Sequence, residues 1–571
     1  MRTRAGFRLG GAGSTIPRMA TARAARAPSS PKPTFAQAKR APQLSGGLPF
    51  VGHTMGFLRD LTGLLTSARA ECGDVAAIKV LGRDIVLVTG PAAQEEVFRA
   101  KDDVLSPKAA YKLMNPIFGK GVVYDCEDDR MNEQLSMLLP ALQNKRMRVY
   151  SEVISGEVER STKSWGDRGV VDIYEYMQTL TSFTSSHCLL GAEFRNEMSE
   201  EFAQVYHELE RSIVPLAYLN AHLPIPRFRK RDRARARLGD MVSEIVNRRR
   251  ASGTRREDFM QTLMEATYKD GSKLSEHEIS GMLVAAMFAG HHTSSVTAAW
   301  AILELLQNKT WMKTVLDELE SVYGGGRAID FESVRELEKT EWVVKEALRL
   351  HPPLFILIRV AMVDTTILGY KIPKGTWVAL SPSVAHRIDS VFENSAGFCP
   401  HRYGAPAYED KKPFAYISFG GGRHKCMGNA FALLQIKTIM AHLLRAYRFE
   451  LHGDPVESDF HGLVIGPKMP IRVRYTKVER EAATPEAAAD EPEVADAAAA
   501  VANKPFRIVV DEDLCQGHGV CEGEAAELFA LQDDRVKVLN AKPDPALRAK
   551  AEAACEHCPQ RALSLEDLPA T

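Results

Sequence analysis

A glycine-rich loop over residues 419–428, with the sequence FGGGRHKCMG, presents a single cysteine, Cys426. Glycines let a backbone adopt positive φ and pass close to a flat ligand, and neighbouring cations and loop N–H groups favour a thiolate. The loop therefore predicts a thiolate ligand to a metal. The alternative for an isolated cysteine in such a turn is a buried structural thiol.

A second group of cysteines lies near the C-terminus. Four of the nine cysteines, Cys515, Cys521, Cys555 and Cys558, fall within the last 57 residues. No apolar signal segment occupies the N-terminus, and no apolar run reaches the ~18 residues that span a bilayer. These features favour metal ligation and core thiols over a secreted disulfide framework, and they predict a soluble cytoplasmic protein.

A second group of residues that could do chemistry lies within a helix expected over residues 275–306. Ser275 and Glu278 form a capping box at its start, and apolar positions run nearly all round it, as in a buried helix. Its middle is interrupted by His291, His292 and Thr293, and imidazole and hydroxyl groups can relay protons. The alternative is that these are core histidines with no part in chemistry.

A second helix carries Glu346 and Arg349 on one face and is expected to end at His351, where two prolines follow. Taken alone, such a pair is an ordinary surface ion pair.

Charge divides the chain into four parts. The net charge is zero, but residues 1–40 carry nine Lys and Arg and no acid, and residues 479–503 carry seven acids and one Arg among many alanines. We predict a basic disordered leader (1–40), a large helix-rich domain (41–478), a linker (479–503) and a small domain (504–571). The leader could alternatively contact a membrane surface or be a transit peptide.

The loop pattern F-x-x-G-x-H-x-C-x-G resembles the haem-ligand loop of the cytochrome P450 family. This resemblance implies a mainly α fold with small β-sheets, a b-type haem and Cys426 as its thiolate ligand, with Gly420 and Gly422 close to the haem. It also implies that Glu346 and Arg349 lock onto Arg402 of the downstream segment FCPHRY, in a structural role.

Two further motifs are similar to those of the sterol 14α-demethylases within that family. They are the stretch YKLMNPIFGKGVVYD over residues 111–125 and the sequence AGHHT over residues 289–293. The resemblance implies successive O2-dependent oxidations that remove the 14α-methyl group of a sterol as formate. It further implies that His292 and Thr293 deliver protons and that the haem propionates are held by Tyr124, Arg359 and His424. The residues implied to line the substrate cavity are Tyr111, Leu113, Met114 and Phe118. The aliphatic Leu113 favours a 4,4-dimethyl sterol such as lanosterol.

The C-terminal segment looks like a small bacterial-type ferredoxin with an α+β fold. Its C-x-x-H-x-x-C run and distant Cys-Pro resemble a cluster-binding pattern in which His518 replaces one cysteine. The resemblance implies a [3Fe-4S] cluster held by Cys515, Cys521 and Cys558. His518 as a ligand of a [4Fe-4S] cluster and a zinc site remain alternatives, and Cys555 has no assigned role.

The fusion implies that the ferredoxin domain passes electrons to the haem of its own chain. An external NAD(P)H-dependent ferredoxin reductase is then required, and no nucleic-acid partner is indicated. A flexible 25-residue linker has an end-to-end distance on the order of 25–30 Å, so the acidic small domain can reach basic residues near the haem cysteine, with Arg423 and Lys425 as candidates. The alternative functions are hydroxylation of another lipid or terpenoid, and a haem-based sensor.

Overall fold

A computed structural model describes residues 34–479, except 81, 198, 215, 216, 218, 219, 257, 454, 455 and 461–463, and residues 505–568, except 513, 514, 516, 518, 533, 534 and 559–561. Most of the predicted leader and linker therefore lies outside the described residues. At the end of the predicted leader, strand β1 (Lys39–Arg40) pairs with β8 (Tyr370–Ile372), and Ala38 is buried. The boundary between the leader and the large domain stays a prediction.

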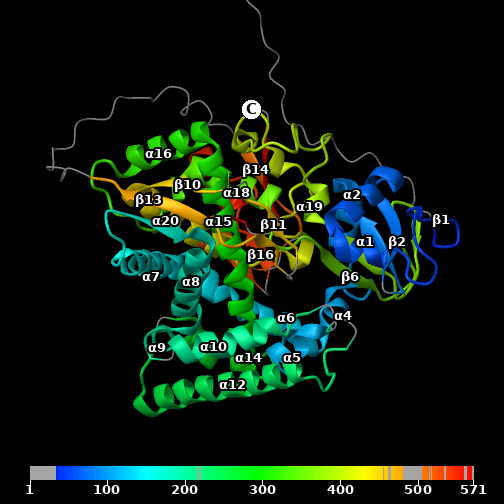
Figure 1. Ribbon diagram of the computed structural model, residues 1–571, viewed down its shortest axis with the longest axis horizontal. Coiled ribbons are helices and arrows are strands. Elements are labelled where there is room, and N and C mark those ends of the chain that lie inside the picture. The colour runs from blue at the N-terminus through cyan, green and yellow to red at the C-terminus, as the bar shows by residue number, and fades with distance from the viewer. Residues whose placement is uncertain are drawn as a thin grey trace, which may run out of the picture.

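The large domain, hereafter the body, is mainly helical (Figure 1). Its long helices are α2 (Leu61–Cys72), α7 (Asn144–Thr162), α8 (Ile173–Ser185), α10 (Ser199–Arg211), α12 (Pro226–Ser252), α14 (Glu276–Gly290), α15 (His292–Gln307), α16 (Lys309–Tyr323), α18 (Glu338–Leu350) and α20 (Asn429–Ala446). Its short helices are α1 (Thr54–Arg59), α3 (Pro91–Arg99), α4 (Pro107–Ala110), α5 (Asn115–Phe118), α6 (Asp128–Ser136), α9 (Ala192–Asn196), α13 (Phe259–Glu265), α17 (Phe331–Arg335) and α19 (Pro382–Ala385).

Small sheets complete the body. The five-stranded sheet has the order β2 (Val75–Val80), β3 (Arg83–Val88), β9 (Trp377–Leu380), β6 (Leu357–Ala361) and β4 (Leu105–Ser106). Three-stranded sheets are formed by β1, β8 and β7 (Thr365–Ile367), and by β10 (Tyr447–Leu451), β13 (Arg472–Lys477) and β5 (Arg168–Asp172). A short pair joins β11 (Ser458–Asp459) and β12 (Gly466–Pro467).

The central helix predicted over residues 275–306 is instead two helices, α14 and α15, which meet at His291 (Figure 1). The predicted capping box is present, because the Glu278 N–H donates to Ser275 Oγ and the Ser275 N–H donates to Glu278 Oε2. At the break, Thr293 Oγ1 donates to the Ala289 carbonyl oxygen at 2.7 Å. This bond spans the break between the two helices.

The C-terminal module (residues 505–568) has an apolar core of its own. Strand β14 (Phe506–Val510) pairs with β17 (Leu563–Asp567), and β15 (Phe529–Gln532) pairs with β16 (Arg535–Val538). Helices α22 (Val520–Glu524) and α23 (Arg548–His557) pack against each other, with Phe506 and Phe529 fully buried. The predicted fold classes, a mainly α body and a small α+β domain, are confirmed.

Candidate haem and cluster sites

The loop that carries Cys426 is held tightly by its neighbours. The Cys426 N–H donates to the Phe419 carbonyl oxygen at 2.8 Å, and Gly420 and Gly422 have φ values of +70° and +63°. A Cβ at Gly422 would lie 1.9 Å from the carbonyl oxygen of Phe98, at the end of helix α3. Only glycine fits there, so α3 and the cysteine loop are locked together.

The Cys426 side chain is exposed in the structure, as a ligand to a bound group must be. Desolvation by the surrounding protein raises the pKa of its thiol, against the opposing effects of the Gly428 N–H and the Lys425 charge. These two opposing effects are the kind that the sequence indicated. A bound metal would supply the further positive charge that favours a deprotonated ligand.

Arg359 is a buried cation suited to a bound anion. Its guanidinium donates to the Ile358 carbonyl oxygen at 3.0 Å, and burial lowers its pKa although Tyr111, Tyr124 and Asp102 lie close enough to oppose the effect. Tyr124 is half-buried, and desolvation by the surrounding protein raises its pKa to about 12, so its hydroxyl stays protonated and can donate. A buried guanidinium beside a phenol fits the carboxylate of a haem propionate.

His424 is already engaged on one side of its ring. Its Nε2 lies 2.7 Å from Asp102 Oδ1. Burial would raise the pKa of Asp102, but the bond to His424 and the nearby charges lower it, so this carboxylate is ionised. The bond to Asp102 fixes the orientation of the imidazole, and Nδ1 is the ring nitrogen that can bind a propionate.

His292 and Thr293 lie at the break between α14 and α15, next to an acid that sequence reasoning missed. Glu210, on α10, forms an ion pair with His292 Nε2, and its Oε1 lies 3.5 Å from Nδ1 of His291. Burial would raise the pKa of Glu210, but its bonds to both imidazoles lower it to about 2. One carboxylate thus holds two histidines at the helix break.

These three groups are also the one set of three His, Cys, Asp or Glu side chains, within the part of the chain that the structure describes, whose ligand atoms lie within 4.8 Å of one another. No sequence signal marked Glu210, because nothing in a single sequence tells which acid of an amphipathic helix faces a histidine about 80 residues later.

The predicted substrate residues lie together over one region of the body. Leu113, Met114 and Phe118 are buried in 3-10 helix η1 (Lys112–Met114) and α5, and the Tyr111 ring stacks on Tyr124 at 5.6 Å between centroids. Phe118 contacts the ring of Phe288 on α14 at 6.2 Å. The structure therefore brings Phe118 to α14, the helix that ends just before His291.

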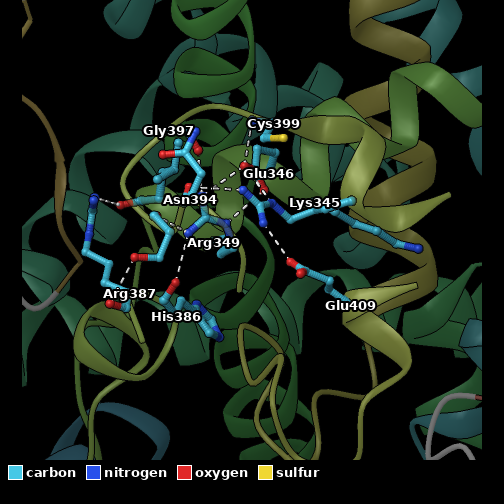
Figure 2. A network of polar contacts seen from close by, with 12 residues as sticks. Lys345, Glu346, Arg349, His386, Arg387, Asn394, Gly397, Cys399 and Glu409 are labelled. Atoms are coloured by element: carbon cyan, nitrogen blue, oxygen red, sulfur yellow. Dashed lines mark hydrogen bonds and ion pairs between the residues drawn. The ribbon is translucent and has the colours of Figure 1, made fainter. Parts of the chain in front are cut away.

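Glu346, Arg349 and Arg402 form one buried network. Figure 2 shows Glu346 and Arg349 at its centre. Arg349 binds both carboxylate oxygens of Glu346 at 2.9 Å and donates to the carbonyl oxygens of His386, Ser395 and Gly397. Arg402 joins Glu346 at 3.1 Å and Glu409 at 2.6 Å. The network ties α18, which ends at Leu350 as predicted to within one residue, to the segment that precedes the cysteine loop.

The C-terminal module brings its cysteines together. Burial raises the pKa of Cys521 to about 12, and the neighbouring Cys558 and Cys515 raise it further in the same direction. Cys558 Sγ accepts the Ala562 N–H at 3.3 Å, and hydrogen bonds to sulfur are typical of iron–sulfur ligands. Burial raises the pKa of Cys555 to about 12, and the charges of the nearby Cys558 and Cys521 act in the same direction. His518 lies outside the described residues.

The spacing of these thiols bears on the zinc alternative. The described cysteines form no group of three whose sulfurs all lie within 4.8 Å, whereas sulfurs around one zinc ion, each bonded at ~2.3 Å, must be closer than that. A multi-iron cluster accommodates the wider spacing.

Comparison with known protein families agrees with both sites. Residues 42–473 match the cytochrome P450 family model, and residues 510–565 match the model described as the 4Fe-4S single cluster domain of ferredoxin I. Haem and an iron–sulfur cluster are therefore the cofactors of this chain. No helix among the described residues is long and apolar enough to cross a membrane.

Relatives with known names extend across kingdoms. A sterol 14α-demethylase of Mycobacterium tuberculosis is 41% identical over 76% of this chain and 98% of its own length. An obtusifoliol 14-alpha demethylase of Sorghum bicolor is 37% identical over 77% of this chain and 91% of its own length. A lanosterol 14-alpha demethylase of Bos taurus is 35% identical over 78% of this chain and 89% of its own length.

Among solved structures, the retinoic acid-bound cyanobacterial CYP120A1 has a TM-score of 0.67, with 22% identity over 77% of this chain and 100% of that one, which shows a shared fold. The spacing around Cys426, the matched residues 42–473 and full-length relatives at 35–41% identity lead to one conclusion: this chain belongs to the cytochrome P450 family, among its sterol 14α-demethylases, and carries a ferredoxin domain at its C-terminal end.

Proposed function

We propose that this protein removes the 14α-methyl group of a lanosterol-like sterol, with electrons supplied by its own ferredoxin module. The observation that carries the proposal is the 41% identity to a sterol 14α-demethylase over nearly that protein's whole length. Three oxidations convert the methyl group to an alcohol, to an aldehyde and then to formate, with a new ring double bond. Each oxidation consumes one dioxygen, two electrons and two protons and releases water.

The residues present fit haem. Cys426 supplies the thiolate, and Arg359, Tyr124 and Nδ1 of His424 supply cationic or donor groups for the propionates. When bound, haem provides a thiolate-ligated iron that activates dioxygen. Glu346, Arg349 and Arg402 hold the segment leading into the cysteine loop and act as positioning residues.

The chain's contribution to proton delivery centres on His292 and Thr293. The Thr293 hydroxyl lies at the helix break, where it bonds the Ala289 carbonyl, and His292 lies beside it, paired with Glu210. Imidazole exchanges protons near neutral pH, so a histidine held by an ionised carboxylate can pass a proton to the adjacent hydroxyl. Glu210 orients this histidine and is a positioning residue.

Substrate recognition falls to the apolar residues near α14. The apolar side chains of Leu113, Met114 and Phe118, with Tyr111 at the edge, suit the flat hydrocarbon of a sterol. Leu113 supports a substrate with two methyl groups at carbon 4. In the Leu113→Phe variant, we expect the ratio of kcat/KM for a sterol with one 4-methyl group to that for a 4,4-dimethyl sterol to rise about tenfold. One methyl group in an apolar pocket is worth about 1–3 kcal/mol.

The electron route uses the three clustered cysteines Cys515, Cys521 and Cys558 as cluster ligands, with [3Fe-4S] favoured because histidine stands at position 518. The chain then needs an external NAD(P)H-dependent ferredoxin reductase. The predicted cytoplasmic location and membrane contact of the leader remain predictions.

The test is turnover of the full-length protein with lanosterol, NADPH and a ferredoxin reductase but no added ferredoxin. We expect formate and the 14-demethylated sterol in equal amounts. Product that appears only after a separate ferredoxin is added would refute the internal electron route. Absence of product with both electron sources, in protein that has an intact carbon monoxide difference band, would refute the sterol reaction instead.

A further inference from the structure

Two groups of polar contacts join the ferredoxin module to the body. Arg99 Nη2 lies 3.1 Å from Asp511 Oδ2, and these side chains are about one-quarter exposed. Glu524 is more deeply buried: its Oε1 accepts from Asn144 Nδ2 at 2.7 Å and lies 3.5 Å from Arg335 Nη2. Both groups pair an acid of the module with donors of the body.

On the body, these contacts lie on elements that pack against the Cys426 loop or against the helix that follows it. Arg99 follows Phe98, whose carbonyl oxygen lies directly under Gly422, and its guanidinium lies 5.5 Å from the centre of the Phe414 ring. Asn144 begins α7 and Arg335 ends α17, and both helices pack on α20, which follows the cysteine loop. The module therefore rests on the cysteine side of the body.

On the module, the same contacts hold the segment that contains two cluster cysteines. The Asp511 carbonyl oxygen accepts the Cys515 N–H at 3.0 Å, and Glu524 closes α22, the helix that contains Cys521. Between them, Gly519 lies beside the body, since a Cβ there would be in van der Waals contact with Gln143, 3.7 Å from its Nε2. Gly519, two residues before the cluster cysteine Cys521, thus faces the body.

We propose that Arg99–Asp511 and the contacts of Glu524 form the docking interface for electron transfer, and that the module must leave this interface to be reduced. This inference rests on the proposed electron route. In the docked position one electron passes from the reduced cluster, which is oxidised, to the ferric haem, which becomes ferrous. Docking places Asp511, Gly519 and Glu524, which flank the cluster cysteines Cys515 and Cys521, against the body. The external reductase therefore reaches the cluster only in the separated position.

The proposal assigns opposite effects to the same contacts. Neutralising Asp511 weakens docking, so electron transfer from the cluster to the haem becomes slower. Reduction of the cluster by the reductase is not slowed, and it becomes faster if separation of the module from the body is its rate-limiting step. Damage to the module's fold or cluster would instead slow both steps.

The experiment is stopped-flow spectroscopy of the full-length chain under carbon monoxide, with Asp511→Asn, Arg99→Gln and the double variant. We expect each single variant to slow haem reduction by at least about fivefold at low salt, with the double variant little slower than either, as for partners in one contact. Glu512→Gln is the matched control, since this neighbouring acid is exposed and its ion-pair partner, Arg535, lies within the module. Small-angle X-ray scattering at low salt should show a larger radius of gyration for the double variant than for the wild type.

Unchanged haem reduction in Asp511→Asn, additive losses in the double variant, or an equal loss in Glu512→Gln would each overturn the interface. Slower cluster reduction in Asp511→Asn would overturn the separation step. If the wild-type cluster is reduced but never reduces the haem, the proposed electron route itself fails, and a compact wild type in scattering would then show that the module docks for another purpose.

Discussion

Glu210 and His292 form an ion pair between helices α10 and α15, at the point where the central helix is interrupted. The acid is largely buried, and its pKa of about 2 lies well below its ordinary value of 4.5. A structural acid and a residue with a proposed proton-transfer role are therefore parts of one charged group.

The first prediction concerns this acid. A carboxyl group whose pKa is lowered in the folded state stabilises the protein fully above its unfolded pKa, and the contribution is lost as the pH falls toward the folded value. Glu210→Gln should thus reduce the free energy of unfolding at pH 7 by about 2–3 kcal/mol. The difference from wild type should shrink below pH ~4.5, where unfolded-state glutamate becomes protonated. Urea unfolding at pH 7 and pH 4 measures this, and a difference that stays constant would contradict it.

The second prediction concerns Thr293. Removing its hydroxyl in Thr293→Ala should lower product formation about 10–100-fold while NADPH consumption continues, because general acid–base groups contribute gains of that order or more. Sterol binding, measured by the spectral shift of the haem, should stay unchanged.

A matched control lies one turn further along the same helix. Thr297 makes the same kind of bond, from Oγ1 to the Thr293 carbonyl oxygen at 2.7 Å. Thr297→Ala should keep the ratio of product to NADPH. An equal loss of that ratio in both variants would show that helix geometry, and not the Thr293 hydroxyl, is responsible.

The third prediction concerns the buried network of Glu346. Glu346→Gln leaves Arg349 and Arg402 buried without their common carboxylate, and breaking such a pair costs about 3–5 kcal/mol. We expect a lower content of haem per chain and a lower midpoint of thermal unfolding. Lys313→Gln, which breaks an exposed pair with Asp317, should change neither. Full haem loading in Glu346→Gln would refute the positioning role.

The fourth prediction concerns the cluster ligands. Cys521→Ser should abolish iron–sulfur absorbance and NADPH-driven turnover but retain the carbon monoxide band, because the haem site belongs to the body. Cys555→Ser should retain the cluster if the ligands are Cys515, Cys521 and Cys558. Iron and sulfide analysis of both variants checks this, and loss of the cluster in Cys555→Ser would add a ligand to the set.

The local features of this protein were determined by the sequence itself. The cysteine loop, the capping box of Ser275 and Glu278, and the end of α18 before two prolines depend on residues a few positions apart, so one sequence suffices to predict them. The chemistry expected at Cys426 also followed from the residue types in a ten-residue loop.

The tertiary structure decided which distant groups meet. Glu210 beside His292, Asp102 beside His424 and Asp511 beside Arg99 are partners separated by about 80 to more than 400 residues. Glu210 lies on a helix, whereas Asp102 and Asp511 lie in loops, and only the packing of the surrounding elements selects which charge lies beside which. The sequence named Arg423 and Lys425 as candidate docking residues for the module because they neighbour Cys426. Among the described residues, the fold also places Arg99, Asn144 and Arg335 against acids of the module. Local sequence thus determined what the groups can do, and long-range packing determined with which partners they do it.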